Sequence, residues 1–270
     1  MDYLVDQPFC FPIIRYKPEN WESLAQTLCE QAEKLKEDPK LGAKLSHGWR
    51  NEGTFEMQTA EKKEDYDEHG YSSYRSGISL FSEPWLTPFK EIHEEAFQAC
   101  YRYCSASPFW VEKYMKDADL ENLGLLNHAW VSIYGKGHFI PEHVHTDSHL
   151  SWVFYGASDG ETGKIIFRNP ANAHFRMIYN DDASLFCETW KLPPEVGCFY
   201  VFPSFMNHYT EQHEGDENRI IYSGNFVFRQ SVIGSGTQFR MNQWSRPHET
   251  VSNRYRKNEP KKKKKKQGNK

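Results

Sequence analysis

Ala129-Trp130-Val131-Ser132-Ile133-Tyr134 is the stretch that decides the fold. Small and branched apolar residues alternate in it with Trp130, Ser132 and Tyr134, and a period of two is typical of a β-strand. Four further short apolar runs follow, separated by glycine, proline or acidic clusters, and they cover residues 150–155, 164–168, 198–202 and 220–228. Several short strands with turns between them predict an antiparallel sandwich or barrel.

Helical periodicity precedes these strands. Residues 20–37 are predicted to form a helix that Asn20 caps, because apolar residues recur there at helical spacing. A second helix is predicted to start at Thr87-Pro88, since proline is favoured at the first helical position. The expected fold is therefore α+β and mainly β, with helices backing one sheet. The expected division is residues 1–126 (N-terminal helices and a surface excursion), 127–232 (the β core) and 233–270 (a polar extension with a lysine-rich tail).

The composition indicates a globular chain that crosses no membrane. Its 270 residues are 15% aromatic, which is enough to build a core. It has no run of about 18 apolar residues, the length that a membrane span needs. The first residues lack the basic start and apolar stretch of a secretory signal, so we expect a cytoplasmic protein. Six cysteines without a Cys-x-x-Cys pair are expected to be free thiols.

The net charge of −4 hides an asymmetry along the chain. Seven of the 33 basic residues lie in Lys261–Lys270, which leaves 26 basic against 37 acidic residues elsewhere. An acidic body is a poor match to a phosphate backbone. The tail is expected to be a solvated end, with a contact to nucleic acid or an acidic partner as the alternative.

Twelve histidines are present, and two closely spaced ones carry the functional argument. His143 and His145 lie at the edge of a predicted strand, where alternation puts both rings on one face, roughly 6.6 Å apart along the chain. Such a pair can bind one metal ion if another strand supplies a third ligand. By contrast, five histidines in polar contexts are predicted to be surface residues, namely His47, His69, His93, His213 and His248.

His208 and Arg219 extend this pattern. His208 follows the apolar run 197–202, which would cross the same barrel and could bring the third imidazole. Arg219 shares a strand face with Ser223 and Asn225. An arginine that points into a barrel needs an anion, and a ligand carboxylate could supply it through a bidentate pair. An acid on the rim is the alternative partner.

Together these motifs resemble a family of 2-oxoglutarate- and iron(II)-dependent oxygenases found in bacteria and tailed phages. The resemblance covers about residues 127–228. It rests on His143-x-His145, the strand Leu150-Ser151-Trp152-Val153-Phe154-Tyr155, Phe167-Arg168-Asn169-Pro170, Gly197 with Phe202-Pro203-Ser204 and His208, and Arg219 with Ser223 and Asn225. It implies a double-stranded β-helix (jelly roll) in the cytoplasm of a bacterial cell or phage-infected host. It also implies iron at His143 and His208, and 2-oxoglutarate gripped by Arg219.

The third metal ligand is the point at which the chain departs from the wider superfamily. A carboxylate usually follows the first histidine by two residues, in a two-histidine, one-carboxylate triad. His145 takes that place here and is read as the ligand, while Asp147 stays an alternative if the chain turns after His145. Tyr134 is a further candidate for the cofactor pocket, with ordinary packing as its alternative.

The resemblance implies an Fe(II)- and 2-oxoglutarate-dependent dioxygenase. Such an enzyme hydroxylates a substrate, which the sequence does not identify, with O2 and releases succinate and CO2. Two other functions stay open. One is a three-histidine cupin-type dioxygenase that uses no 2-oxoglutarate, in which Arg219 would hold the carboxylate of the substrate. The other is a non-catalytic jelly-roll binding or assembly module.

Overall fold

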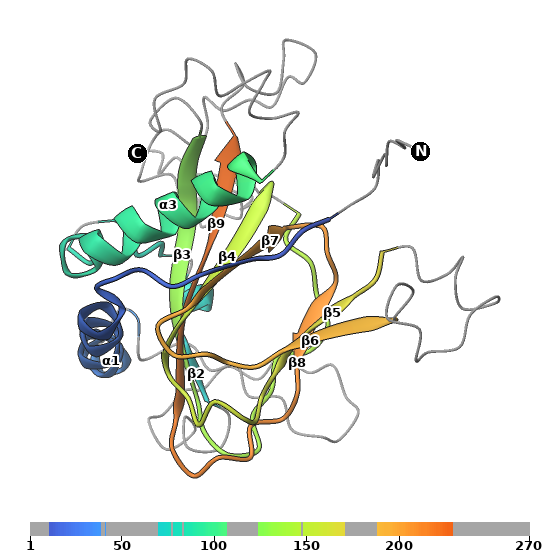
Figure 1. The fold of residues 1–270 in the computed structure, drawn as a ribbon. Coiled ribbons are helices and arrows are strands. Elements are labelled where there is room, and N and C mark those ends of the chain that lie inside the picture. Colours follow the sequence, from blue (N-terminus) through green and yellow to red (C-terminus); the bar gives the residue numbers. More distant parts are fainter. Residues whose placement is uncertain are drawn as a thin grey trace, which may run out of the picture.

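The alternating segment identified first forms the long strand β3 (Gly124–Tyr134) of a six-stranded antiparallel sheet. The computed structural model describes residues 11–38, 41, 70–76, 78–82, 84–106, 124–146, 148–170 and 188–228. Within them the sheet has the order β1-β7-β4-β9-β3-β2 (Figure 1). Its other strands are β1 (Ile14–Tyr16), β2 (Tyr71–Ser72), β4 (Leu150–Ala157), β7 (Phe199–Pro203) and β9 (Arg219–Phe228).

A second, three-stranded antiparallel sheet has the order β6-β5-β8. It consists of β5 (Ile165–Arg168), β6 (Thr189–Leu192) and β8 (His208–Thr210). His143, outside the named strands, forms an antiparallel bridge with His208. The segment before β4 therefore runs beside β8.

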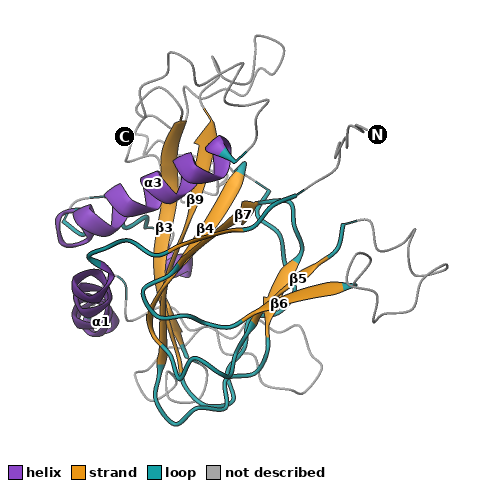
Figure 2. Cartoon of the chain, viewed as in Figure 1, coloured by secondary structure: helices purple, strands orange, loops and turns teal. Residues whose placement is uncertain are grey.

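The two faces of the large sheet have different neighbours. Its outer face carries Ala129, Val131 and Ile133 into a core shared with the helices α1 (Trp21–Glu37) and α3 (Lys90–Ser105). Figure 2 shows both helices on that side of the sheet. Its inner face packs against the small sheet in a second core, which joins Tyr134, Val153, Tyr155 and Ile221 to residues such as Phe167 and Leu192. The alternation of β3 thus separates a helix-facing side from an inward-facing side.

Both predicted helices are confirmed. α1 begins directly after Asn20, although the Asn20 side chain makes no capping hydrogen bond. Thr87-Pro88 opens a 3-10 turn, η2 (Thr87–Phe89), and α3 follows it directly. Another 3-10 turn, η1 (Ser73–Ser76), follows β2.

The prediction of five strands is confirmed, in β3, β4, β5, β7 and β9. Four strands of two to four residues, β1, β2, β6 and β8, have no counterpart among the predicted apolar runs. The surface assignment of two histidines is wrong: the exposed fraction is 7% for His93 and 0% for His213. His93 lies on the face of α3 that packs against the large sheet, where its Nε2 is hydrogen-bonded to the Tyr222 hydroxyl of β9. A polar sequence context does not reveal this burial, because the covering residues are distant in sequence.

The remaining expectations concern membrane spans, the cysteines, the C-terminal extension and Asp147. No described helix is long and apolar enough to span a bilayer. Cys29, Cys100, Cys104 and Cys198 are free thiols. The extension 233–270 with its lysine tail, and the alternative ligand Asp147, lie outside the described residues.

Leu28 tests how α1 docks on the sheet. Its buried side chain lies so close to Gly156 of β4 that a Cβ on this glycine would sit 2.7 Å from Leu28 Cδ2. We expect Leu28→Ala to lower the free energy of unfolding by about 2–5 kcal/mol in chemical denaturation, since it leaves a cavity. Gln26→Ala, on the exposed face of the same helix, is the control. An equal loss in both variants would contradict this docking.

Candidate metal centre

Three imidazole rings meet where the segment before β4 lies beside β8. One ring nitrogen from each of His143, His145 and His208 lies within 4.8 Å of the other two. The backbone fixes the meeting, because His143 and His208 exchange two N–H···O bonds of 3.0 Å. The His145 N–H donates to the Ser204 carbonyl at 2.9 Å. The predicted metal ligands thus converge from separate parts of the chain.

Two of these rings are oriented by carbonyls of their own chain. His143 Nδ1 lies 2.8 Å from the Pro141 carbonyl, and His208 Nδ1 lies 2.8 Å from the Met206 carbonyl. Since a carbonyl only accepts, Nδ1 carries the proton in both rings and Nε2 keeps its lone pair. A hydrogen bond of this kind sets the tautomer of a metal-binding histidine.

His145 is oriented by stacking. Its ring lies against His208, with centroids 5.2 Å apart and planes at 9°, and against Trp130, at 5.6 Å and 23°. Trp130 lies on the inner face of β3, in register with Ser223 of β9. Trp130 is not among the site residues predicted from the sequence. Because Trp130 and Tyr134 are four residues apart on one strand, they face the same side of the sheet, and this spacing could have indicated the position of Trp130.

Burial keeps the three rings neutral. It lowers the pKa of His143, and it lowers the pKa of His145 to about 3. Burial, reinforced by the other two imidazoles, also brings the pKa of His208 well below its usual range. A neutral imidazole is the form that binds a metal.

Arg219 is a buried cation without an acidic partner. Its exposed fraction is 1%, and no described carboxylate lies within ion-pair distance of it. Nη1 donates to the Gly163 carbonyl at 2.5 Å and Nη2 to Thr210 Oγ1 at 3.4 Å, while Nε has no partner. The guanidinium lies 5.2 Å from the centroid of the Tyr134 ring. No described carboxylate therefore forms an ion pair with Arg219, although Asp159 on the neighbouring turn acts on the guanidinium electrostatically.

Thr210 connects the arginine to the histidines. Thr210 and His208 are buried residues of β8 on the same face, with only Tyr209 between them. Two residues along a strand span roughly 7 Å. The guanidinium, which contacts Thr210, therefore lies one step along β8 from the histidine cluster. Thr210 is not among the residues predicted from the sequence, although its spacing of two residues from His208 would place both side chains on one strand face.

Ser223 and Asn225 share the inner face of β9 with Arg219, as their parity predicted. Four residues separate Ser223 from Arg219, roughly 13 Å along an extended strand. The hydroxyl that contacts the guanidinium is that of Thr210. Asn225 Oδ1 accepts a hydrogen bond of 3.1 Å from Ser151. The two residues line the same wall, beside Trp130 and Ser151.

An opening of about 350 Å³ leads along the small sheet. Phe167, which lines it, is in register with both His208 and Trp190, so the opening borders the histidine cluster. Its apolar lining consists of Phe11, Ile13, Phe167, Pro170, Trp190 and Met206. The polar lining residue Arg168 is already bonded to Glu142 and Glu188.

Residues 128–225 match the family model described as "Putative 2OG-Fe(II) oxygenase", which confirms the resemblance seen in the motifs. Fe(II) and 2-oxoglutarate are the cofactors of that family, and the three histidines are the candidate metal site. The match lies within the β-rich half and contains both the histidines and Arg219.

Three of the solved structures that match this chain cover different shares of it. A 2OG-Fe(II) oxygenase family oxidoreductase from Burkholderia pseudomallei is 12% identical, with a TM-score of 0.31; the match covers 38% of this chain and 43% of that one. A prolyl-4-hydroxylase from Pseudomonas putida is 13% identical over 80% of this chain and 92% of its own, with a TM-score of 0.41. AviO1 from Streptomyces viridochromogenes is 12% identical over 80% and 89%, with a TM-score of 0.49. The comparison with curated proteins gives no match.

The cluster predicts a metal site that depends on His208. We expect the protein to bind one equivalent of Fe(II) or Co²⁺, and His208→Ala to lose it, because only two of the three imidazoles would remain to hold the metal. Anaerobic calorimetry and metal analysis after desalting measure this. Tyr209→Phe changes the neighbouring residue on the other face of β8 and should bind like the wild type. Full occupancy in His208→Ala would contradict the assignment.

Proposed function

We propose that this protein is a 2-oxoglutarate- and Fe(II)-dependent dioxygenase that hydroxylates its substrate and releases succinate and CO2. One observation carries the proposal. Three neutral imidazoles with converging nitrogens lie one strand step away from a buried guanidinium that forms no ion pair with any described acid. A metal ion and a dianionic 2-oxo acid would satisfy both halves of that arrangement.

The strand order supports a jelly-roll core. From β3 onward the chain passes from the large sheet to the segment at His143 beside β8, and back to β4. It then forms β5 and β6 in the small sheet, β7 in the large sheet, β8 in the small sheet and β9 in the large sheet. This alternation between two facing sheets is what a double-stranded β-helix requires. We assign the core to residues 127–232, with the N-terminal helices as its support.

The histidines fit a divalent iron. Imidazole nitrogen suits Fe(II), and the two ring tautomers set by Pro141 and Met206 leave Nε2 as the donor. Three neutral ligands leave the site with the full charge of the cation. A dianionic co-substrate would neutralise this charge, whereas a carboxylate ligand would reduce the attraction.

The arginine fits the far carboxylate of 2-oxoglutarate. The Nε–H of Arg219 is buried and unpaired, and together with Nη2–H it forms an edge that can donate to both oxygens of one carboxylate. Thr210 Oγ1 already accepts from the Ile140 N–H at 2.9 Å and from Arg219. Its own proton therefore remains available for the same carboxylate.

The bound iron and 2-oxo acid would supply the oxidising chemistry, and the protein would supply position and a dry environment. Arg219 and Thr210 would fix one end of the co-substrate, and the histidine nitrogens would fix the metal at the other. Burial raises the pKa of Tyr134 and Tyr155, so both phenols stay protonated beside the arginine. The apolar opening with Trp190 and Met206 would admit the substrate.

A three-histidine dioxygenase that uses no 2-oxoglutarate is the second candidate. The all-histidine cluster favours it, because a carboxylate ligand is usual in the 2-oxoglutarate-dependent class. In that case Arg219 would hold the carboxylate of the substrate. The 2-oxoglutarate-dependent reading is preferred because the matched family uses this co-substrate.

Binding of the chelate is the direct test of the proposed function. Anaerobic addition of Fe(II) and 2-oxoglutarate should produce a visible metal-to-ligand charge-transfer band. Arg219→Ala should weaken 2-oxoglutarate binding by roughly 10- to 100-fold, the cost of a charged hydrogen-bonded pair, while Fe(II) binding persists. Arg168→Ala removes an arginine that is already paired with Glu142 and Glu188 and is the matched control. The absence of a band in the wild type would sink the proposal.

Co-substrate dependence separates the two candidate functions. We expect slow oxygen consumption by the Fe(II)-loaded protein to require 2-oxoglutarate and to yield succinate in equal amount. Oxygen electrode traces and succinate quantification, with and without 2-oxoglutarate, measure this. Oxygen uptake that needs a thiol or a small acid, and no 2-oxoglutarate, would favour the three-histidine alternative.

A further inference from the structure

The Gly163 carbonyl, at 2.5 Å, is the closest hydrogen-bond acceptor of Arg219. Gly163 has a φ of +64°, and a Cβ on it would lie 1.9 Å from Arg219 Nη1. A side chain at this position cannot coexist with the present guanidinium. The turn that ends at Gly163 therefore determines where the guanidinium lies.

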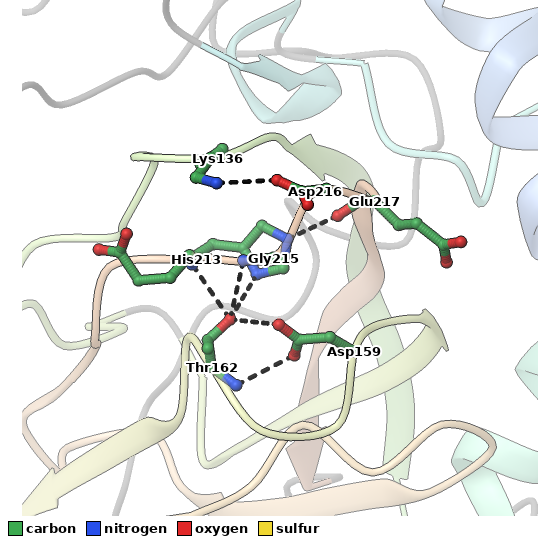
Figure 3. A network of polar contacts seen from close by, with 8 residues as sticks. Lys136, Asp159, Thr162, His213, Gly215, Asp216 and Glu217 are labelled. Carbon is green, nitrogen blue, oxygen red and sulfur yellow. Dashed lines mark hydrogen bonds and ion pairs between the residues drawn. The ribbon is translucent and has the colours of Figure 1, made fainter.

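Thr162 fixes this turn to the segment that leads into β9. Its hydroxyl donates to Asp159 Oδ2 at 2.5 Å and accepts from the backbone N–H of Glu214 at 3.1 Å and Gly215 at 3.3 Å (Figure 3). The hydroxyl thus donates one hydrogen bond and accepts two. Thr162 joins two segments that are more than fifty residues apart in sequence.

Asp159 and His213 complete the connection. Asp159 Oδ1 accepts from the backbone N–H of Glu161 and Thr162, both at 3.0 Å. Burial alone would raise the pKa of Asp159, but the hydrogen bond from the Thr162 hydroxyl, together with these two backbone bonds, brings it down to about 2, so the carboxylate stays ionised and engaged within its own turn. The buried His213 ring lies 3.2 Å from Thr162 Oγ1 and bonds to the Glu217 carbonyl at 2.6 Å (Figure 3).

The joined segments hold Arg219 from two directions. The segment 213–217 ends two residues before Arg219 and so sets the place of its backbone, while Gly163 sets the place of its guanidinium. If the two segments moved apart, the guanidinium would lose its acceptor or shift along the pocket. Because Asp159 is occupied, the arginine keeps its unpaired edge for an external carboxylate.

We propose that Thr162 is a positioning residue for Arg219 and thereby sets the preference of this site for a 2-oxo acid with a second carboxylate. The inference rests on the proposed function, since it assigns Arg219 to the far end of the co-substrate. Thr162 itself touches neither metal nor co-substrate. Its effect runs through the Gly163 carbonyl.

The first test uses the protein without metal or co-substrate. The Nε–H resonance of Arg219, assigned with an Arg219→Lys variant, should show slow solvent exchange in the wild type, because the group is buried. Thr162→Val removes the hydroxyl at nearly constant volume and should shift this resonance and speed its exchange. Thr162→Ser, which keeps the hydroxyl, should resemble the wild type. An unchanged resonance in folded Thr162→Val overturns the proposal, whatever the protein catalyses.

The second test compares two ligands on the anaerobic Fe(II)-loaded protein. 2-Oxoglutarate and 2-oxovalerate have the same chain length, but only the first carries a far carboxylate. Thr162→Val should weaken 2-oxoglutarate binding roughly tenfold, as expected for an impaired charged hydrogen bond, and leave 2-oxovalerate binding unchanged. Gly163→Ala displaces the guanidinium without removing a hydrogen-bonding group from the turn, and it should act in the same way.

Lys136→Met is the matched control, because it removes a side-chain contact to the same segment 213–217 without touching Thr162. It removes the exposed ion pair between Lys136 and Asp216 (Figure 3), whose contribution should be small. We expect the wild-type ratio of the two dissociation constants in this variant and in Thr162→Ser. Equal weakening of both ligands in Thr162→Val indicates general destabilisation and overturns the proposal. A wild type that binds the two ligands equally overturns the proposed function itself, and with it this inference.

Discussion

The burial of the Arg219 guanidinium is the constraint on which the rest of the structure depends. A cation with an exposed fraction of 1% and no acidic partner in the described chain is costly to place inside a β-sandwich. The protein offsets this cost only in part, with one carbonyl, one hydroxyl and the face of Tyr134. Burial accordingly lowers the pKa of Arg219, although an arginine stays charged. Among the described residues such a group is an incomplete half of an ion pair, which is why the proposed function assigns its missing half to a ligand carboxylate.

Strand register brings this cation to the metal centre. Arg219 pairs with Tyr134 across β3 and β9, while its side chain reaches Thr210 on the opposite sheet. Because alternate residues of β8 face the same way, Thr210 and His208 present their side chains to one space. A slip of one residue in β8 would turn both outward together. The separation of the histidine cluster from the arginine thus depends on a strand of three residues, His208–Thr210.

The sequence predicts which strand faces line this site better than it predicts how far apart the residues lie along the strands. Alternation identified the inward side of β3 and β9, and the i, i+2 pair His143 and His145 identified two of the three candidate metal ligands that converge in space. Alternation shows that Ser223 and Arg219 share a strand face, but it does not show which hydroxyl reaches the guanidinium. That contact is made by Thr210, which was not predicted. The strand β8 is too short for periodicity to reveal. The burial of His213 depends on Thr162 and Glu217, through contacts that a local reading of the sequence does not contain.

The two ends of the site are therefore organised by different kinds of interaction. At the histidine cluster, His143 and His208 are each oriented by the carbonyl of the residue two positions before them. Most of the ring orientation therefore comes from residues within the same short motif. At the carboxylate end, Arg219 is oriented by Gly163 and Thr210, which belong to other strands and turns. A motif search recognises the first kind of arrangement readily and the second only through its arginine. This difference explains why the candidate metal ligands could be predicted from the sequence, whereas the residues that hold Arg219 could be identified only in the folded chain.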